Sequence, residues 1–408
     1  MGIILNKGQK RAVDIIVPWY RRGCEQIMEM SGGPGTGKTT IVKYITNVLG
    51  LDIQSEVLFV TYVGKASLQL RLSGVNAKTI HSTFYQLEKE YLYDDYNRPM
   101  RYANGRLMYK MNFVRKSYLP KRIKLIVIDE AGMVPDPILN DIKDYGLPIL
   151  CIGDKDQLPP VFGSSSLFKN PDVVLTEIMR QAEGSPIIRI AQKIIKNEEL
   201  DFGYWGQNCS IVDDTVLQKK KPYLSHDIII CARNSTRESI NTHVRFDILN
   251  RKSKFPVVGD KLVCRKNNWQ EELEDIPLTN GMFGYITNID RASYKKDKIN
   301  IDFTPDFLDD AFEDIPMDLT YLFATHEDRQ SGAFFGNGNL FEYAYAATCQ
   351  LAQGSQYDNV MVIDEDSTSH SDYHRRWLYT AVTRAKYGLT IVRKRPKFFI
   401  KPLYKKLL

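Results

Sequence analysis

Short apolar runs alternate with helix-like segments in the first part of the chain. Residues 39–49 have the pattern of a helix, and apolar runs occupy residues 26–30, 56–61, 124–129 and 147–152. Continuous apolar strands separated by helices are typical of a parallel sheet that is covered on both faces. The pattern therefore predicts an α/β unit.

The same pattern returns after residue 172, with apolar runs at residues 227–231, 359–364 and 389–392. A chain of 408 residues has room for two such units, since domains commonly hold roughly 100–200 residues. The predicted fold class is therefore α/β, with two parallel-sheet domains in tandem. We assign residues 1–84 and 118–172 to the first domain, and residues 173–255 and 341–408 to the second.

Two segments interrupt this scheme. Residues 85–117 are rich in Tyr, Arg and Lys, and they contain Asn104-Gly105, a pair typical of a tight hairpin turn, between expected strands at residues 98–103 and 106–111. Residues 256–340 hold short strand-like pieces and an acidic stretch at residues 302–314. We interpret the first segment as an inserted hairpin. The second is interpreted as an inserted small β domain whose acidic stretch is a solvated protrusion.

Composition excludes several classes of protein. The hydrophobic content of 43% and the charged content of 25% are those of an ordinary globular protein, which argues against a disordered, collagen-like or coiled-coil chain. No apolar stretch approaches the roughly 20 residues that cross a bilayer, so no membrane association is expected. The six cysteines are scattered without CxxC spacing, which favours a reducing, cytoplasmic compartment, or the host cytoplasm for a phage-encoded protein. The net charge of +6 is too small to identify a partner.

A glycine-rich segment lies between the first apolar run and the first helix. It matches GxxxxGK[ST], a pattern in which backbone N–H groups curl around phosphates at a helix N-terminus. Lys38 would reach the β- and γ-phosphates, and the Thr39 hydroxyl would bind Mg²⁺. The motif therefore predicts that a nucleoside triphosphate binds here together with Mg²⁺, and the family resemblance described below implies that this nucleotide is ATP. The expected nucleotide-binding residues in this segment are Gly33, Pro34, Gly35, Thr36, Gly37, Lys38, Thr39 and Thr40.

Carboxylates follow a second apolar run. Asp129 and Glu130 come directly after residues 125–128, and the carboxyl ends of parallel strands are where ligands bind in open α/β sheets. Asp129 is predicted to hold Mg²⁺, and Glu130 to orient and deprotonate the attacking water. Gln157, which follows the next apolar run, is a candidate sensor of the γ-phosphate.

The ordered set of motifs resembles one family. The chain is similar to the superfamily 1 helicases of the RecD-like, 5′→3′ subclass, which include the small phage Dda-type enzymes. The resemblance extends along nearly the whole chain, apart from the two inserted segments. The matching strings are residues 5–9, 61–66, 79–81, 157–160, 175–181, 353–358 and 378–386, in addition to the segments already described.

This resemblance implies two RecA-like domains, the first with the inserted hairpin and the second with a small SH3-like β-barrel. It implies an ATP-hydrolysing DNA helicase that translocates 5′→3′ on single-stranded DNA and couples this movement to duplex unwinding. Gln9 would read adenine, and Arg180 and Arg384 would be arginine fingers that act in catalysis together with Lys38, Glu130 and Gln157. The resemblance places nucleic-acid contacts at Lys65, Thr79, His81, Asn234, Thr348 and Gln350.

One motif departs from the family. The usual His-Lys-Ser before Gln-Gly is replaced by Gln350-Leu351-Ala352, so a lysine contact to phosphate is absent there. His370 and His374 have the i,i+4 spacing of a metal site, but no third ligand is implied by spacing, and we interpret them as loop histidines.

The expected partners are single-stranded DNA and a fork duplex, together with replication or recombination proteins, and a monomer is expected. Two alternatives stay open: an RNA helicase on the same frame, and an accessory protein that binds single strands and uses the nucleotide only as a switch. The inserted hairpin is the candidate wedge that separates the strands.

Overall fold

The structure is a computed structural model that describes residues 5–94, 96–101, 107, 109–160, 163–177, 184–273, 276–295, 297–330, 338–366 and 371–394. The side chains of residues 65, 68, 69, 72, 87, 109–111, 269, 326 and 330 are outside this description. The chain divides into two compact units, Met1–Glu183 and Gly184–Leu408.

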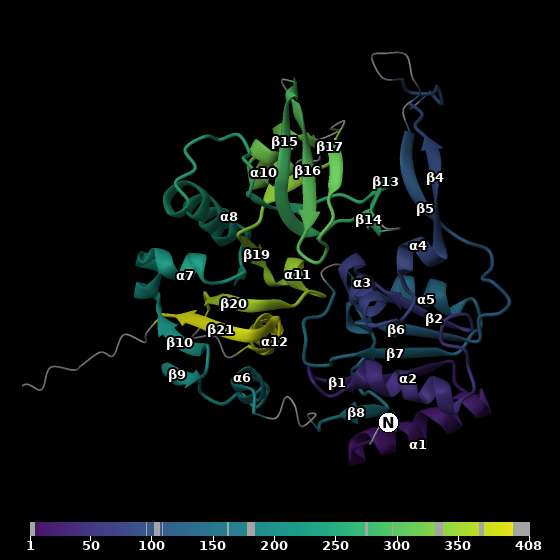
Figure 1. Cartoon of the computed structure of the whole chain (residues 1–408). Coiled ribbons are helices and arrows are strands. Elements are labelled where there is room, and N and C mark those ends of the chain that lie inside the picture. The colour runs from purple at the N-terminus through teal and green to yellow at the C-terminus, as the bar shows by residue number, and fades with distance from the viewer. Residues whose placement is uncertain are drawn as a thin grey trace, which may run out of the picture. The chain divides into compact units, whose positions relative to one another are not determined.

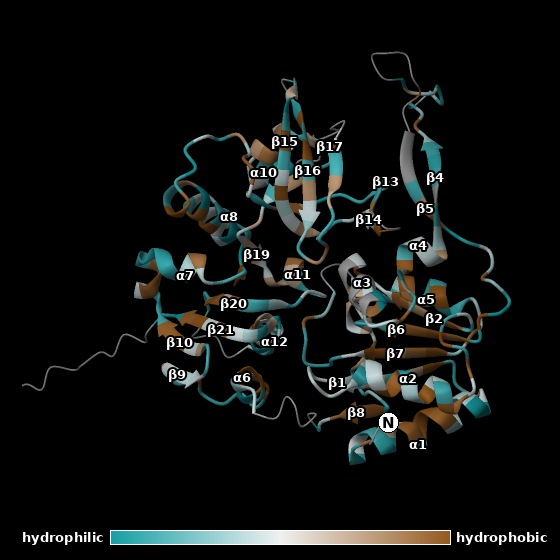
Figure 2. Cartoon of the chain, viewed as in Figure 1, coloured by the Kyte–Doolittle hydropathy of each residue, from teal (hydrophilic) through white to brown (hydrophobic). Residues whose placement is uncertain are grey.

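A six-stranded parallel sheet forms the centre of the first unit (Figure 1). Its order is β3 (Ala77–Thr79), β2 (Val57–Thr61), β6 (Leu125–Asp129), β7 (Ile149–Gly153), β1 (Ile27–Gly32) and β8 (Val173–Leu175). Apolar strands such as β6 and β7 stand out as hydrophobic in Figure 2. The parallel α/β unit predicted from the apolar runs is therefore confirmed.

Helices cover both faces of this sheet. The helices of the first unit are α1 (Lys7–Arg22), α2 (Lys38–Val48), α3 (Gly64–Leu72), α4 (Ile80–Phe84) and α5 (Asp136–Lys143). One set of strand residues, including Phe59 and Val127, packs in a core with α1 and α2. Their neighbours in sequence, including Val60 and Ile128, pack in a second core with α4 and α5. This alternation follows from the two-residue period of a strand.

Strand β8 belongs to the first unit. It pairs in parallel with β1, with Met30 opposite Val173 and Gly32 opposite Leu175. The first sheet thus extends beyond residue 172, where the sequence pattern had suggested the domain boundary, and the compact unit ends at residue 183.

The inserted hairpin consists of β4 (Tyr85–Tyr91) and β5 (Tyr109–Arg115), which pair antiparallel from Tyr85 opposite Arg115 to Tyr91 opposite Tyr109. Only residues 109–111 of this ladder fall within the strands expected at 98–103 and 106–111, and an isolated antiparallel bridge joins Arg101 and Leu107 across those two expected strands. A turn precedes that bridge. Asp94 accepts the backbone N–H groups of Tyr96 and Arg98, each at 2.9 Å. The Asn104-Gly105 turn lies outside the described residues.

The base of the hairpin is tied to α5. The Tyr85 hydroxyl donates to Asp141 Oδ2 at 2.5 Å, and Arg115 Nη1 donates to Asp141 O at 3.1 Å. Arg115 Nη1 also forms an ion pair with Asp144 Oδ2 at 2.9 Å. Both strands are therefore anchored to one helix at the end from which they leave the sheet domain.

A second six-stranded sheet forms the centre of the second unit. Its order is β19 (Ala346–Thr348), β11 (Ile228–Cys231), β20 (Tyr357–Asp364), β21 (Ala385–Arg393), β10 (Cys209–Asp213) and β9 (Gly203–Gly206). All pairs are parallel except that of β9 with β10. The main helices of this unit are α6 (Pro186–Ile195), α7 (Lys220–Leu224), α8 (Asn234–His243), α11 (Cys349–Ala352) and α12 (Asp372–Val382), with a short π-helix at Val244–Ile248.

The second insertion is a five-stranded antiparallel sheet. Its order is β17 (Phe312–Asp318), β16 (Lys298–Pro305), β15 (Phe283–Lys295), β12 (Lys261–Cys264) and β18 (Phe341–Tyr343). A bridge between Met317 and Asn339, with Asn339 N donating to Pro316 O at 2.8 Å, joins its two edges into a small barrel. The two-stranded sheet of β13 (Asn268–Leu273) and β14 (Ile276–Leu278) and the helices α9 (Leu319–Phe323) and α10 (His326–Gln330) complete it.

Buried charges lie where the insertion leaves the second sheet domain. Arg245, which has no exposed surface, donates through Nε and Nη2 to Asp260, at 3.1–3.2 Å. Asp260 also accepts the Tyr345 hydroxyl at 2.7 Å and binds Arg251. The next residue, Lys261, pairs with Asp306 from the acidic stretch at 3.5 Å. Asp306 is therefore not simply a solvated charge.

Among the residues that the structure describes, no helix is long and apolar enough to span a membrane. All six cysteines are free, and only Cys24 is exposed.

Candidate functional site

The glycine-rich loop joins β1 to α2. Gly35 and Gly37 have φ angles of 75° and 79°, which L-residues with a side chain rarely adopt. Gly32 is restricted by space instead, since a Cβ there would lie 2.6 Å from Thr36 Oγ1. The loop can therefore take this path only with glycine at these positions, and it delivers the chain directly into the N-terminus of α2.

Lys38 is the first residue of α2 and folds back over the loop. Its Nζ donates to Gly32 O at 2.7 Å and to Gly33 O at 3.3 Å. Thr39 and Thr40 follow in the first turn of the helix, where backbone N–H groups have no partner within the helix. The ammonium group, the hydroxyls and the helix N-terminus are thus collected at one place, as the sequence motif predicted.

Gln9 reaches this loop from α1. Its Nε2 donates to Thr36 O at 3.2 Å, and its Oε1 accepts the Asn6 backbone N–H at 3.2 Å, which completes the capping box of α1. The Gln9 side chain is buried. It therefore fastens the first helix to the phosphate loop, and the reading of adenine by this residue stays a prediction.

Asp129 and Glu130 are placed at the end of β6. Burial, followed by the neighbouring Glu130 carboxylate, raises the pKa of Asp129 to about 6, while Lys38 acts in the opposite direction. Glu130 has a φ of 51°, a left-handed conformation that costs a residue with a side chain about 1–3 kcal/mol and is concentrated at functional sites. The backbone strain turns the chain sharply at this carboxylate. Oδ1 of Asp129 stabilises the turn by accepting the Glu130 N–H at 2.9 Å.

Gln157 lies in the turn after β7. Its backbone N–H donates to Asp154 O at 3.3 Å, and the preceding Lys155 N donates to Ser31 Oγ at 3.0 Å, which ties this turn to the end of β1. Asp154 is buried. The turn therefore has a fixed position beside the glycine-rich loop.

The parallel register explains why these residues meet. Ser31 at the end of β1 pairs with Gly153 at the end of β7, and Ile128 in β6 pairs with Cys151. The carboxyl ends of three neighbouring strands thus lie along one edge of the sheet. The charge of Lys38 acts to lower the pKa of Asp129, as expected for two groups at the same edge of the sheet.

His81 lies in an aromatic cluster that the sequence did not predict. Its ring centroid is 5.7 Å from that of Tyr62, 5.5 Å from Tyr85 and 5.0 Å from Phe113. Burial lowers the pKa of His81, which favours the neutral ring. Phe113 is 45% exposed, so the cluster presents an aromatic surface at the base of the hairpin. The signal in the sequence was the aromatic residue at each root of the insertion.

The other predicted nucleic-acid contacts occupy helix starts. Thr79 caps α4 by accepting the Ser82 N–H at 3.2 Å, and Thr348 caps α11 by accepting the Leu351 N–H at 3.4 Å. Asn234 is the first residue of α8. Gln350 Nε2 donates to the exposed Tyr373 hydroxyl at 3.0 Å. Lys65 lies in α3, and its side chain is outside the described residues.

Arg384 is buried within the second unit. Its Nε donates to Thr380 O at 3.0 Å, Nη1 to Ser355 O at 3.3 Å and Nη2 to Thr383 Oγ1 at 3.2 Å. These bonds hold the guanidinium at the end of α12. Its role as an arginine finger stays a prediction, and Arg180 lies outside the described residues.

His374 is engaged within the second sheet domain. Its Nε2 lies 2.8 Å from Asp364 Oδ1, and its ring stacks on Trp377. His370 lies outside the described residues. In the part of the chain that the structure describes, no group of three His, Cys, Asp or Glu residues is placed to hold a metal ion.

Solved structures of helicases share this fold. The structure of two coordinating Pif1 helicases at forked dsDNA has a TM-score of 0.54 and 18% identity, and the match covers 95% of this chain and 92% of that chain. The Bacteroides Pif1 helicase in complex with ADP-AlF3 and ssDNA has a TM-score of 0.51 and 16% identity, with 96% and 92% coverage. At these identities the likeness is one of fold.

Curated relatives carry helicase names. The chain is 23% identical over 386 residues to the ATP-dependent RecD2 DNA helicase of Deinococcus radiodurans, a match that covers 88% of this chain and 46% of that protein. It is 22% identical over 320 residues to the ATP-dependent DNA helicase dda of Enterobacteria phage T4, covering 71% and 68%. The chain thus spans less than half the length of the Deinococcus relative.

Two family models match in the order expected from the motifs. The model described as an AAA domain matches residues 4–207, which is half of the chain, and the model described as a UvrD-like helicase C-terminal domain matches residues 343–392. The first match contains the phosphate loop and both carboxylates, and the second contains Arg384. The chain belongs to the superfamily 1 ATP-dependent helicases of the RecD/Pif1/Dda family.

Proposed function

We propose that this protein hydrolyses Mg-ATP to move 5′→3′ along single-stranded DNA and to unwind the duplex ahead of it. The observation that carries the proposal is the collection of the phosphate loop, Lys38, Asp129 and Glu130 at one edge of the first sheet. The family supports the polarity, and the Pif1 structures determined with ssDNA and forked dsDNA support the substrate.

The residues present fit a bound Mg²⁺. Magnesium prefers oxygen ligands, and the Thr39 hydroxyl and the Asp129 carboxylate supply them. The raised pKa of Asp129 reflects an acidic pair in a partly buried place, where a divalent cation would stabilise both charges. When bound, the ion neutralises charge that develops on the phosphates.

The protein groups would then divide the work. Lys38 Nζ exchanges the carbonyls of Gly32 and Gly33 for phosphate oxygens, which keeps its three donors satisfied. Glu130 accepts a proton from the attacking water and orients it. Gln157, held in the turn after β7, donates a hydrogen bond to the γ-phosphate.

The nucleic-acid contacts we propose combine stacking and polar groups. The surface formed by His81 and its aromatic neighbours offers flat rings to unstacked bases, and base stacking on aromatic side chains is tolerant of sequence. Thr79, Lys65, Asn234, Thr348 and Gln350 would contact the sugar-phosphate backbone. The protein would act as a monomer in the cytoplasm, alongside replication or recombination proteins.

We propose the β4–β5 hairpin as the wedge that splits the duplex. A wedge must resist the force of the arriving fork, and the bonds from Tyr85 and Arg115 to α5 support such stiffness. Its tip, with Tyr102, Arg106 and Met108, lies outside the described residues. We also propose that the small barrel inserted in the second unit has an SH3-like fold.

The two alternatives predict different substrates. An RNA helicase would open RNA duplexes with overhangs in preference to DNA duplexes. A nucleotide-switched accessory protein would bind ATP with little turnover, which the strained Glu130 beside Asp129 argues against.

Separate substitutions at the nucleotide site should separate binding from hydrolysis. Lys38→Ala removes the charge that binds the phosphates, so both nucleotide affinity and turnover should be lost. Glu130→Gln keeps the shape of the side chain and removes the base, so affinity should be retained while turnover falls by about 10²–10⁴. Fluorescent-nucleotide binding and phosphate release, measured on the same preparations, check this. A Glu130→Gln protein with wild-type turnover would remove Glu130 from the chemistry.

Arg384→Ala should retain nucleotide binding and lower DNA-stimulated turnover by roughly 10³–10⁵, the effect of an arginine finger in related phosphoryl transfer. Because Arg384 also binds Thr380 O and Ser355 O, thermal unfolding must be recorded alongside. Arg376→Ala, which removes a surface ion pair with Asp372 on the same helix, is the matched control and should be neutral. Arg180→Ala should behave as Arg384→Ala does. Unchanged turnover at saturating DNA would exclude either residue.

Polarity and substrate can be tested together. Duplexes with a 5′ single-stranded tail should be opened in an ATP-dependent reaction, and those with a 3′ tail should not. The comparison of DNA with RNA versions of the same duplexes separates the DNA helicase from the RNA helicase, with strand displacement followed by gel or fluorescence. Preferential opening of 3′-tailed DNA would contradict the assigned direction.

Loosening the hairpin should uncouple unwinding from hydrolysis. Deletion of residues 99–109, bridged by a short glycine linker, should preserve DNA-stimulated ATPase and greatly reduce duplex opening. Arg115→Ala, which releases β5 from Asp141 and Asp144, should give a weaker form of the same defect. Lys121→Ala, an exposed change in the following loop, is the control. Normal unwinding by the deletion variant would show that the hairpin is not the wedge.

A further inference from the structure

A cavity of about 330 Å³ lies within the second unit. It is formed by α8, the π-helix Val244–Ile248, α9, the end of α10 and β18, where the barrel insertion packs against the sheet domain. Its volume is within the range of small-ligand pockets. No motif in the sequence pointed to it.

Positive charge predominates in its walls. Four cationic side chains line the cavity against two carboxylates: Arg237, Arg245, Lys254 and Arg329 against Glu238 and Glu342. Arg245 is neutralised by Asp260, and Arg237 and Arg329 are paired with Glu342 and Glu238. Lys254 therefore carries the excess positive charge at this cavity, and an entering anion would be stabilised beside it.

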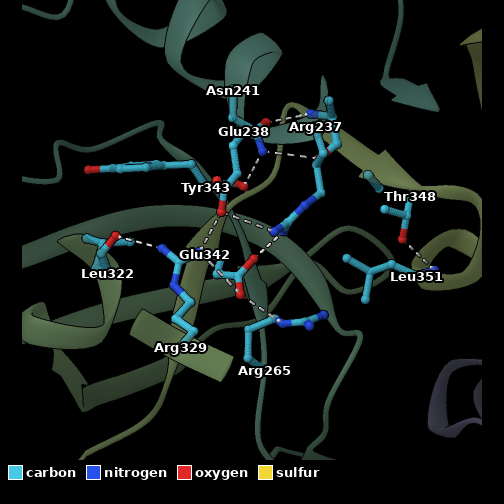
Figure 3. A network of polar contacts seen from close by, with 12 residues as sticks. Arg237, Glu238, Asn241, Arg265, Leu322, Arg329, Glu342, Tyr343, Thr348 and Leu351 are labelled. Atoms are coloured by element: carbon cyan, nitrogen blue, oxygen red, sulfur yellow. Dashed lines mark hydrogen bonds and ion pairs between the residues drawn. The ribbon is translucent and has the colours of Figure 1, made fainter. Parts of the chain in front are cut away.

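Glu342 is the centre of the network on one side of the cavity (Figure 3). Arg237 and Arg329 form ion pairs with it from two elements, and Arg265 forms a third at 3.1 Å. Burial alone would raise the pKa of Glu342, but the three arginines lower it. The three arginines therefore keep Glu342 ionised, and their positive charges outnumber its single negative charge. Glu342 would consequently not repel an incoming anion strongly.

Two donors at the cavity have no partner among the described residues. Arg237 is 3% exposed, and its Nε is buried without an acceptor. Lys254 is exposed and forms no ion pair; its Nζ lies 5.8 Å from the centroid of Phe255 and 5.6 Å from that of Phe323. The buried Nε of Arg237 and the exposed Nζ of Lys254 are thus the donors at this cavity that a ligand could use.

Aromatic rings form the remaining walls and the rim. Phe246, Phe323 and Tyr343 line the cavity. Phe323 is 38% exposed, and it packs edge-to-face on Phe255, which does the same with Tyr294. Flat apolar surface of this extent beside a lysine is unusual for a solvated face, and it is suited to a planar ring.

We propose that this cavity binds a nucleotide, with the base against Phe323 and the phosphate at Lys254. An anion alone would not use the aromatic rim, and an apolar ligand would not use the ammonium group of Lys254, whereas a nucleotide uses both. The proposal rests on the proposed function, because a helicase exposes unstacked nucleotides close to its own surface. The nucleotide would come either from a single strand or from the free pool.

The test measures two ligands with one set of variants of the full chain. Binding of a labelled oligo(dT) is followed by fluorescence anisotropy, and binding of free dTMP by calorimetry. Phe323→Ala and Phe323→Leu should weaken binding roughly 5- to 150-fold, the loss of one stacked base, and Phe323→Tyr should restore it. A loss confined to the oligonucleotide identifies the strand as the source, and a loss confined to dTMP identifies the free nucleotide. If Phe323→Ala bound each of the two ligands as tightly as the wild-type protein does, the proposal would be overturned.

Lys254→Ala tests the phosphate contact separately. Removal of one contact should lower the slope of log affinity against log salt by about 0.7 for a single strand, and Lys254→Arg should retain it. An unchanged slope would overturn the assigned phosphate position. Matched controls are Tyr204→Ala, an aromatic residue that is 86% exposed on β9 at the opposite edge of the sheet, and the exposed Lys196→Ala. If the Phe323→Leu protein bound both ligands with wild-type affinity, the contact would be apolar packing alone. That result would overturn the proposal that a base stacks on Phe323.

Failure of this inference is distinguishable from failure of the proposed function. If the wild-type chain has DNA-stimulated ATPase but no substitution in the cavity changes either affinity, only the proposed nucleotide site in the cavity is refuted. A wild-type chain without DNA-stimulated ATPase refutes the helicase, whatever the cavity binds.

Discussion

The parallel pairing of β1 between β7 and β8 is the constraint on which the nucleotide site depends. Because the strands run in one direction, their carboxyl ends, which carry the polar residues, must lie along one edge of the sheet. The pairing of Ser31 with Gly153 then fixes where the glycine-rich loop begins relative to the turn after β7. Gly32 lies so close to Leu175 and Thr36 that no larger residue fits between them. The chemistry of the loop therefore depends on tight packing of the sheet beneath it. The strained backbone at Glu130 likewise follows four buried residues of β6, Leu125 to Ile128.

Local patterns in the sequence were sufficient for the two sheets and for the nucleotide site. Apolar strands, the glycine-rich loop and Asp129-Glu130 are each encoded within a few consecutive residues. The hairpin was placed correctly, but the pairing of residues 85–91 with residues 109–115 was not predicted, and the expected turn at Asn104-Gly105 lies outside the described residues. The domain boundary was missed because β8 has only three residues, too few for a periodic signal. The contacts of Gln9 with Thr36 O and of Arg384 with Thr380 O and Ser355 O were also out of reach, because backbone carbonyl groups are common to all residue types.

The charged side chains at the root of the barrel insertion show a second kind of contact that could not be predicted from the sequence. Arg237 in α8, Arg265 directly after β12 and Arg329 in α10 come from separate parts of the sequence, yet all three meet around Glu342 in β18. Breaking a buried ion pair by removing one partner typically costs about 3–5 kcal/mol. The insertion is therefore joined to the sheet domain by directional contacts in addition to apolar packing. Such contacts specify one orientation of the insertion relative to its own sheet, and this orientation shapes the cavity.

The strand order of the second sheet has a consequence for synthesis of the chain. Strand β11 lies between β19 and β20, and the ribosome synthesises both of these strands only after the entire barrel insertion. The first unit, in contrast, has its last strand by residue 175. During translation, β11 must wait with both edges unpaired while more than a hundred residues emerge, and unpaired apolar edges invite aggregation. The nascent chain thus passes through a stage in which one finished domain is tethered to an open, half-built sheet, and chaperone demand should be highest there.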